Sequence, residues 1–383
     1  MNGKLKIFHL ITGLQTGGAE TMLAKLVGGM DKSRFENVVL NMSAGPSMLA
    51  GIIEKNGSRV ETVAMRPVWR LPSGMAKLVS LIKREKPHIL QTWLHHADFF
   101  GMLAARMAGD TPVLWNLRCA ELAVEDHPKS LFYILQLLAR NSALPEAVIV
   151  NSRAGLLAHE AIGYKPRRWE IIPNGFDVER FAPSDEKRRA ARRQLGIGDK
   201  TPVIGLVARY HPMKDHATFL AAAGLVHKKR PDAVFVMAGT GVDSSNETIM
   251  SQIRREGLNG SIHALGEVAD VPGITAALDI ATCSSYSEGF PNVIGEAMAC
   301  EVPCVVTDAG DSSEILGDYG VVVPPRDPSA MAEGILKLLA MSEVDRRELG
   351  RRARQKIVSN YSLEQITRRY QSLYEEIAGQ RRQ

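Results

Sequence analysis

The feature that most constrains the fold of this 383-residue chain is a repeated alternation of short apolar runs with longer amphipathic ones. The short runs, rich in β-branched residues, are typical of buried strands, and the longer runs are typical of helices that cover a sheet. Strands that alternate with helices in this way favour doubly wound parallel sheets. The sequence therefore predicts an α/β fold, with ligands bound at the carboxyl ends of the strands.

The expected strands fall into two groups along the chain. In the first half they lie near residues 5–12, 36–42, 59–63, 88–92, 112–116, 147–151 and 169–172. In the second half they lie near residues 202–208, 233–238, 261–265, 279–283, 303–307 and 320–323. Helical periodicity fills most gaps, for example at 19–29, 75–86, 97–108, 153–162, 216–229, 247–256 and 328–340.

The two groups indicate two domains. A chain of this length with 45% hydrophobic residues forms two sizeable cores. Pro, Asn and Gly interrupt the pattern within residues 172–189, and a charged helix follows. We therefore predict a first domain over 1–177 and a second over 178–360.

Charge and cysteine usage limit the classes of function. Residues 1–180 carry a net charge of +6, against +5 for the whole chain, which fits a surface that meets phosphate groups on a lipid-linked acceptor at a membrane or on nucleic acid. Nucleic acid is disfavoured because no recognised binding motif is present. No apolar run is long enough for a membrane span and no signal peptide is evident, so we expect a cytoplasmic protein. The four cysteines lack zinc-ligand spacing and are expected to be reduced.

Two glutamates lie eight positions apart across a predicted turn from strand to helix, Glu288 in the loop 284–292 and Glu296 in a helix over 293–300 that Asn292 would cap. The start of such a helix offers free N–H groups and a positive dipole end, which suit a diphosphate. Glu288 would accept hydrogen bonds from sugar hydroxyls. Glu296, about one turn inside the helix, would accept two from a ribose.

Spacing alone favours the explanation that these glutamates bind no ligand, because glutamate pairs are common and an acid in the first turn of a helix interacts favourably with the helix dipole. The whole segment SEGFPNVIGEAMAC, however, resembles the E-x7-E signature of the retaining glycosyltransferases of family 4, also called group 1. That resemblance implies the GT-B fold, in which two Rossmann-like domains face a central cleft. It also implies a set of donor-binding residues: Gly289, Phe290, Pro291, Asn292, Val293 and Glu296.

Two cations, Arg209 and Lys214, follow the strand near 202–208. At a strand end they would neutralise a departing nucleoside diphosphate without a metal, although exposed loop cations are more often only solvated. The segment VARYHPMKDHATFLAAA resembles the phosphate-binding G-R-x4-K-G segment of the same family, with Ala208 and Asp215 in place of its glycines. The resemblance assigns catalytic roles to Arg209, Lys214 and Glu288.

The remaining donor candidates lie in two further loops. Gly17 and Gly18 allow a phosphate or sugar to approach the backbone, although most glycine-rich turns of this kind only connect a strand to a helix. The loop matches neither G-x-G-x-x-G nor a P-loop, which disfavours dinucleotide and ATP binding. In the family it lies across the cleft from the donor diphosphate. The family also binds the nucleotide base through backbone groups that correspond here to Glu267 and Val268.

His96 and Arg118 each follow a predicted strand end in the first half. A histidine that caps or packs a helix is the more frequent explanation for His96. The Q-T-W-x-x-H-A-D wording, however, resembles family 4 enzymes that build bacterial surface polysaccharides, which implies catalysis by His96. Arg118 is an acceptor-side candidate, and many relatives carry a histidine there. In relatives a terminal helix crosses back to the first domain, so residues 361–383 are assigned to it.

The resemblance implies a metal-independent enzyme that transfers a sugar from a UDP- or GDP-linked donor to a hydroxyl of a glycan or lipid-linked acceptor. It would retain the anomeric configuration and serve exopolysaccharide, capsule or lipopolysaccharide synthesis. No cofactor and no metal are expected. The basic amphipathic helix near 75–86 would allow contact with the inner membrane surface, although packing on its own sheet is the favoured explanation. A sugar-nucleotide epimerase and a non-catalytic nucleotide-sugar-binding protein are the alternatives.

Overall fold

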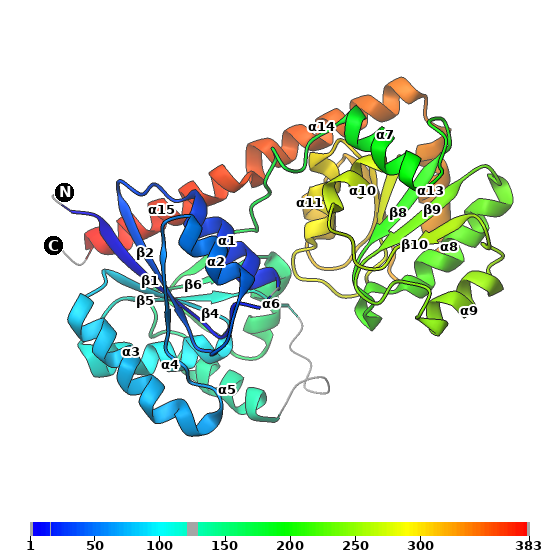
Figure 1. Cartoon of the computed structure of the whole chain (residues 1–383). Helices are drawn as coiled ribbons and strands as arrows, with labels where there is room; N and C mark the ends of the chain where they lie inside the picture. The colour runs from blue at the N-terminus through cyan, green and yellow to red at the C-terminus, as the bar shows by residue number, and fades with distance from the viewer. Residues whose placement is uncertain (1–2, 16, 121–128, 381–383) are drawn as a thin grey trace. The chain divides into compact units, whose positions relative to one another are not determined.

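The computed structural model describes residues 3–15, 17–120 and 129–380 (Figure 1). By its internal contacts the chain divides into two compact units, one formed by Met1–Gly175 with Leu363–Gln383 and the other by Phe176–Ser362. Both unit boundaries lie two residues from those predicted. Each unit contains one parallel sheet with helices on both faces, so the predicted doubly wound α/β architecture is confirmed.

The N-terminal unit contains a seven-stranded sheet in the order β3-β2-β1-β4-β5-β6-β7. Its strands are β1 (Leu5–Ile11), β2 (Phe35–Asn41), β3 (Arg59–Thr62), β4 (Ile89–Trp93), β5 (Val113–Leu117), β6 (Ala147–Val150) and β7 (Trp169–Ile171). All of them lie where the apolar runs predicted strands. The order changes direction between β1 and β4, which are neighbours with Ile7 opposite Ile89. Loops at such a switch point commonly bind ligands.

Helices cover both faces of this sheet. They are α1 (Gly18–Gly29), α2 (Met48–Lys55), α3 (Leu71–Glu85), α4 (His95–Ala108), α5 (Lys129–Arg140), α6 (Arg153–Ala161) and α15 (Leu363–Gln380), with a short 3-10 helix η1 (Val68–Arg70). One face packs against α1, α2 and α15, and the other against α3, α4 and α5. Helix α15 therefore belongs to this unit through a buried face that includes Tyr370 and Tyr374. The last three residues of the predicted terminal segment lie outside the described part.

Helix α3 illustrates how the sequence pattern becomes packing. Leu78 and Ile82 are buried against the sheet, whereas Lys77, Lys83 and Arg84 are exposed. The helix begins at Leu71, four residues before the predicted start, because Pro72 lies in its first turn, where a missing N–H costs nothing. Packing on its own sheet therefore accounts for the amphipathic pattern of this helix.

The C-terminal unit contains a six-stranded sheet in the order β10-β9-β8-β11-β12-β13. Its strands are β8 (Val203–Val207), β9 (Val234–Ala238), β10 (Ile262–Ala264), β11 (Ile280–Cys283), β12 (Cys304–Thr307) and β13 (Gly320–Val323). Its helices are α7 (Asp185–Gln194), η3 (Pro212–Lys214), α8 (His216–Lys229), α9 (Glu247–Arg255), α10 (Val271–Ala277), α11 (Asn292–Ala299), α12 (Ser312–Leu316), α13 (Pro328–Ala340) and α14 (Glu343–Tyr361). The switch point of this sheet lies between β8 and β11, where Ile204 pairs with Ile280.

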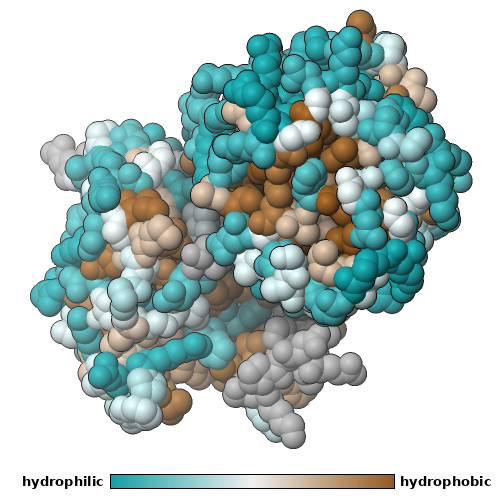
Figure 2. All heavy atoms as spheres, turned by 45° about the vertical axis from the view of Figure 1, so that its right-hand side comes forward, coloured by the Kyte–Doolittle hydropathy of each residue, from teal (hydrophilic) through white to brown (hydrophobic). Residues whose placement is uncertain are grey.

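One face of the second sheet packs against α10, α11 and α14, and the other against α8, α9 and α13. Hydrophilic residues predominate on the face of the molecule drawn in Figure 2, with apolar residues in smaller groups between them. Within the described residues, no helix combines the length and the apolar composition needed to cross a membrane.

Candidate active site

The two loops at the switch point of the C-terminal unit are bonded to each other. One follows β8 and carries Lys214, and the other follows β11 and carries Glu288. The Ser284 hydroxyl donates to the backbone oxygen of Lys214 at 2.7 Å. The Tyr286 amide donates to the backbone oxygen of Met213 at 3.0 Å. These bonds fix the distance between the loops, so the side chains that they carry are held at one place.

Lys214 and Glu288 meet at this place. The Lys214 ammonium donates a short, charge-assisted hydrogen bond to Glu288 Oε1, and the Ser285 hydroxyl donates to the same oxygen at 2.7 Å. The Lys214 side chain is 22% exposed and that of Glu288 is 11% exposed. Both groups thus keep access to solvent while their geometry is fixed, which suits them to exchange partners with an incoming ligand.

Arg209 differs from Lys214 in having an exposed side chain for which the described residues provide no hydrogen-bond or ion-pair partner. It lies just after β8, where its backbone runs close to the loop that follows β9. The Tyr210 amide donates to the oxygen of Thr240 at 2.8 Å. A side chain on Gly239 would place Cβ 2.2 Å from the oxygen of Ala208, and φ of Gly239 is +148°, so only glycine fits there.

The loop 288–291 is held by contacts with neighbouring segments of the same unit. The Asp311 amide donates to Gly289 O at 3.0 Å. Gly310, at φ +59°, brings its backbone so close that an added Cβ would lie 2.3 Å from Glu288 O. Phe290 is buried and stacks against Phe176, with ring centroids 6.0 Å apart. This support leaves Glu288 little freedom to move.

The start of helix α11 differs from the prediction by one residue. Asn292 is the first helical residue and the cap is Pro291, for which no side-chain capping bond exists. The predicted capping role of Asn292 is therefore wrong. Proline fixes its own φ near the value that precedes a helix, so the turn forms without a capping side chain. Val293 and Glu296 lie half-buried on this helix, Glu296 in its second turn.

The loops after β9 and β10 complete the same edge of the sheet. The Gly239 amide donates to Gly266 O at 2.7 Å, and the Gly266 amide donates to Val242 O at 2.7 Å. The Thr240 hydroxyl donates to the carboxylate of Glu267 at 3.3 Å. Glu267 is exposed and Val268 is half-buried. The candidate residues of the C-terminal unit thus belong to one continuous set of bonded loops.

In the N-terminal unit, Gly17 and Gly18 stand at the start of α1. Gly17 is the cap of the helix and Gly18 its first residue. A Cβ on Gly18 would meet no atom of the described residues within 4 Å, whereas one on Gly17 would lie 2.3 Å from the carboxylate of Glu20. Burial raises the pKa of Glu20. The backbone at this helix start is therefore open to a ligand, with one acidic group beside it.

His95 and His96 begin helix α4, which starts two residues earlier than predicted. The residue before them, Leu94, has φ +73°, a costly conformation for a non-glycine residue that recurs at functional sites. His95 is buried and hydrogen-bonded to His159, whereas His96 is half-buried. Burial, with a smaller effect from Arg66, lowers the pKa of His96 below 6.5, so this imidazole is neutral at pH 7 and able to accept a proton.

Arg118 is engaged by other parts of its own unit. Its guanidinium donates to the side-chain oxygen of Asn174 and, at 3.4 Å, to the Tyr370 hydroxyl of α15. It also lies over the Trp93 ring, 5.5 Å from the centroid. Burial lowers its pKa, although it remains charged at neutral pH. These contacts fix the Arg118 side chain at the end of β5, and its acceptor-side role stays a prediction.

Sequence reasoning missed two residues at the switch point of the C-terminal unit. Ser285 holds the Glu288 carboxylate, and its place three residues before Glu288 in a loop was the available signal. Arg326 lies over the Tyr286 ring, 4.1 Å from its centroid. Arg326 follows β13, forty residues beyond Tyr286, so spacing could not have related the two.

Comparison with known families identifies the chain. A family model described as glycosyltransferase family 4 matches residues 16–180, and one described as glycosyl transferases group 1 matches residues 201–341. The chain belongs to the group 1 glycosyltransferases. The predicted family and enzyme class are therefore confirmed.

Relatives extend over most of this glycosyltransferase. It is 27% identical over 323 residues to EpsF of Bacillus subtilis, which covers 81% of each chain. It is 25% identical over 306 residues to the UDP-Gal:alpha-D-GlcNAc-diphosphoundecaprenol alpha-1,3-galactosyltransferase of Escherichia coli, which covers 78% of each. The solved structure of Anabaena HepE in complex with UDP has a TM-score of 0.84 at 23% identity and covers 97% of this chain and 100% of that one. The likeness to HepE confirms the GT-B fold.

Proposed function

We propose that the enzyme transfers a sugar from a nucleoside-diphosphate donor to an acceptor hydroxyl with retention of the anomeric configuration. The observation that carries this proposal is the contact between Lys214 and Glu288, held in place by Ser285 at the switch point of the C-terminal sheet. A fixed cation beside a fixed carboxylate matches the two charges that develop when a glycosidic bond to a diphosphate breaks. The diphosphate becomes more negative, and the anomeric carbon becomes more positive.

Donor binding would divide this ion pair between two parts of the substrate. Lys214 and the guanidinium of Arg209, which has no hydrogen-bond or ion-pair partner among the described residues, would bind the diphosphate together with the N–H groups at the start of α11. Glu288 would accept hydrogen bonds from hydroxyls of the sugar and stabilise positive charge at the anomeric carbon. Glu296 would hold the ribose hydroxyls. Gly289 to Val293, which form the loop and the first turn of α11, would line the donor site.

In the reaction, the bond between the anomeric carbon and the diphosphate oxygen breaks as the acceptor oxygen attacks the same face of the sugar. The acceptor proton passes to the leaving diphosphate oxygen, so the products are the new glycoside and the protonated nucleoside diphosphate. On the acceptor side, the neutral His96 would orient the acceptor hydroxyl by donating its ring N–H to the hydroxyl oxygen, so that the hydroxyl proton remains available to the diphosphate. Gly17 and Gly18 would admit the donor phosphates to the start of α1.

Analysis of the products tests the reaction class. The purified enzyme is incubated with nucleotide sugars and candidate acceptors, and the products are separated and identified by mass spectrometry and anomeric proton NMR. A new glycoside with the donor's anomeric configuration supports the proposal, whereas an inverted glycoside refutes retention. A changed free sugar nucleotide would indicate an epimerase. Tight binding without any product would indicate a binding protein.

A UDP-linked donor is favoured over a GDP-linked one. The Escherichia coli relative uses UDP-Gal by name, and HepE was solved with UDP and with UDP-glucose. We place the base against the backbone at Glu267 and Val268, where the loops after β9 and β10 are bonded together. Thermal shift of the protein with UDP and with GDP distinguishes the two, since only the ligand that binds the folded state raises Tm. Stabilisation by GDP alone would overturn this assignment.

The acceptor is proposed to be a polyprenyl-diphosphate-linked glycan used in surface polysaccharide synthesis. The Escherichia coli relative acts on a diphosphoundecaprenol-linked sugar by name. In the N-terminal unit, Val68 and Trp69 are 80% and 79% exposed and lie between the exposed Arg66 and Arg70. Exposed apolar side chains flanked by cations suit the surface of an anionic membrane. Peripheral contact at the cytoplasmic membrane face follows from this proposal.

Vesicle binding tests the membrane contact. The wild-type protein should sediment with vesicles that contain phosphatidylglycerol more than with neutral phosphatidylcholine vesicles, and Trp69→Ser should weaken this binding. Tyr133→Ser on α5 is the matched control, because Tyr133 is also an exposed aromatic residue of the same unit. Equal binding of Trp69→Ser and the wild type would remove this surface from the proposal.

A further inference from the structure

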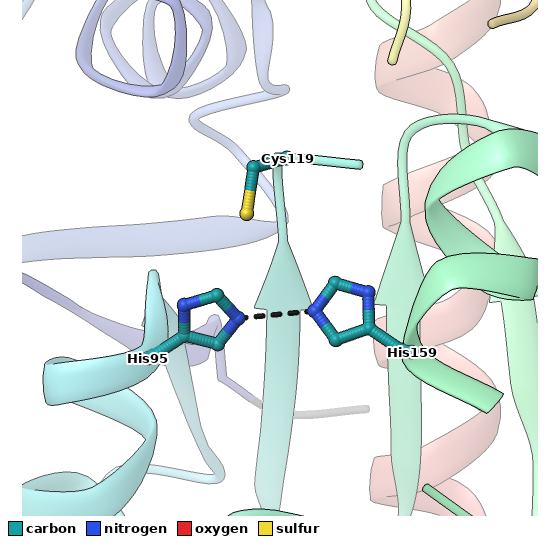
Figure 3. Close-up of side chains that lie close together, drawn as sticks. All are labelled: His95, Cys119 and His159. Atoms are coloured by element: carbon teal, nitrogen blue, oxygen red, sulfur yellow. Dashed lines mark hydrogen bonds between the residues drawn. The ribbon is translucent and has the colours of Figure 1, made fainter. Parts of the chain in front are cut away.

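Three potential metal ligands from distant parts of the sequence lie together in the N-terminal unit: His95, Cys119 and His159 (Figure 3). His95 is the first residue of α4, Cys119 follows β5, and His159 lies in the last turn of α6. Both histidines are buried and the cysteine is half-buried. The sequence predicted no metal site, because these residues are 24 and 40 positions apart and show no ligand spacing.

The donor atoms of the three side chains converge. One ligand atom from each residue lies within 4.8 Å of the others, and the two Nε2 atoms are 3.0 Å apart. In Figure 3 the Cys119 sulfur points toward the two rings, which face each other across the dashed hydrogen bond. A tetrahedral zinc site with ordinary bond lengths separates its nitrogen ligands by about 3.3 Å and a nitrogen from a sulfur by about 3.6 Å. The cluster therefore needs only a small opening of the histidine pair and an approach of the sulfur by roughly 1 Å.

The hydrogen bonds of His159 fix the tautomer in which its Nε2 atom could bind a metal. Its Nδ1 lies 2.7 Å from the backbone oxygen of Gly155, and a carbonyl oxygen only accepts, so Nδ1 carries the proton. The Nε2 lone pair of the neutral ring then points at His95, which donates its own Nε2 proton to it. A histidine that donates its other N–H to a backbone carbonyl is the usual arrangement around protein-bound metals.

The geometry points to a binding site for a divalent transition-metal ion of the zinc class, with His95 Nε2, His159 Nε2 and Cys119 Sγ as ligands. Binding would move the His95 proton from Nε2 to Nδ1 and release the thiol proton of Cys119 to solvent. Three protein ligands leave a fourth tetrahedral position for a water molecule or an added ligand. The donor set contains two imidazoles and one thiolate and no carboxylate, which selects against Mg²⁺ and Ca²⁺.

Such a metal would connect three elements that are otherwise separate in the sequence. The ligands follow β4 and β5 and lie on α6, so a bound ion would fix the carboxyl ends of two adjacent strands to one helix. Two of the ligands are direct neighbours of the acceptor-side candidates, since His95 precedes His96 and Cys119 follows Arg118. Occupancy would therefore set the position of these candidates and stabilise the N-terminal unit, whatever the donor specificity of the enzyme.

The test is metal binding by the full-length protein after treatment with a chelator and a thiol reductant. Zn²⁺ is titrated against a chromophoric indicator, and Co²⁺ serves as a spectroscopic probe. We expect one Zn²⁺ per chain and a Co²⁺ complex with a thiolate-to-cobalt absorption in the near ultraviolet. Tm should rise with Zn²⁺ concentration, because the ion binds the folded state.

Variants decide whether these residues bind the ion. Cys119→Ser and His159→Gln should each weaken Zn²⁺ binding at least a hundredfold, and Cys119→Ser should abolish the thiolate absorption. His263→Gln and Cys300→Ser, which change a histidine and a cysteine outside the cluster, should keep both properties. Because His159 is fully buried, circular dichroism is used to check that the His159→Gln variant is folded. If it is not, the Cys119→Ser variant, changed at a half-buried position, decides the test.

Two results would overturn the inference. One is the absence of stoichiometric Zn²⁺ and Co²⁺ binding by the wild-type protein. The other is binding that Cys119→Ser leaves unchanged, since the ion would then occupy another place. In either case the His95–His159 hydrogen bond serves only to pack α4 against α6.

Discussion

Replacement of Lys214 by alanine tests whether the ammonium group stabilises the departing diphosphate. In the structure this group is bonded to Glu288, and the loop that carries it is fixed by Ser284 and Tyr286. Alanine removes the positive charge and leaves the loop bonds intact, because those involve backbone atoms of residues 213 and 214. The substitution therefore separates the charge from the architecture of the site.

The expected effects on stability and on catalysis differ in size. The Lys214 and Glu288 side chains are 22% and 11% exposed, and a solvent-screened pair of this kind contributes at most about 1 kcal/mol to stability. For the unit of residues 176–362 this corresponds to a fall in Tm of about 2–4 °C. Loss of one preorganised charge from a transition state costs about 3–4 kcal/mol, which lowers kcat by roughly 10² to 10³.

The assay measures nucleoside diphosphate released from the nucleotide sugar that stabilises the protein, first with water and then with the identified acceptor. Lys228→Ala is the matched control, because Lys228 is an exposed lysine of helix α8 in the same unit. Lys214→Arg should recover part of the lost activity, since it restores the charge with a different shape. If kcat of Lys214→Ala stays within about threefold of the wild type, the assigned role of Lys214 is wrong.

Three further substitutions test the fold that supports the site. Asp279→Asn should lower the free energy of unfolding in urea by about 3 kcal/mol or more, because the buried Arg192, which is bonded to Asp279 at 2.8 Å, loses its countercharge. Gly295→Ala should cost about 1–3 kcal/mol in the same measurement, because its Cβ would lie 2.2 Å from the Phe176 ring. Burial lowers the pKa of His9 to about 4 from an unfolded value of 6.5, so only the unfolded state binds this proton between those pH values. The stability contribution of His9 is therefore complete above pH 6.5 and is lost as the pH falls toward 4. In His9→Gln the free energy of unfolding should fall less over this pH range, by up to about 3 kcal/mol.

Each of these substitutions has a matched control. Asp232→Asn removes an exposed partner of Arg230 and should change stability by less than about 1 kcal/mol. Gly51→Ala, in the interior of α2 with no atom within 4 Å of the new Cβ, should stabilise by about 0.5–1 kcal/mol. His263→Gln, at a half-buried position of the other unit, measures the effect of replacing a histidine as such. Equal effects of a test substitution and its control would contradict the corresponding argument.

The fold was predictable because buried parallel strands are continuous apolar runs, which periodicity detects directly. Strands β8 and β12 illustrate this, since their buried residues occupy the predicted ranges almost unchanged. Helix starts were predicted less well where backbone geometry decides them. Helix α4 begins at His95, directly after Leu94, whose φ is +73°, and no residue preference predicts a positive φ for leucine.

The candidate site was predictable to the extent that local order determines it. Lys214 and Glu288 follow adjacent parallel strands, so their proximity follows from the sheet order alone. The partners of Arg118 could not be predicted, because Tyr370 is 252 residues away and meets it only after α15 packs on the first sheet. Contacts of this kind depend on tertiary packing, which leaves no pattern in the sequence near either residue.

The two units have the same type of strand order, but the contacts that hold their strand-end loops differ. In the C-terminal unit the loops at the switch point are bonded to one another, so Lys214 and Glu288 are fixed by short-range contacts of their own sheet. In the N-terminal unit the corresponding edge depends on distant partners, since Arg118 is held by Tyr370 of the terminal helix and His95 by His159 of α6. Locally fixed loops would suit the proposed donor site, whose chemistry the family shares. An edge held by distant partners changes when any of these partners is substituted, which would suit the proposed acceptor side of the enzyme.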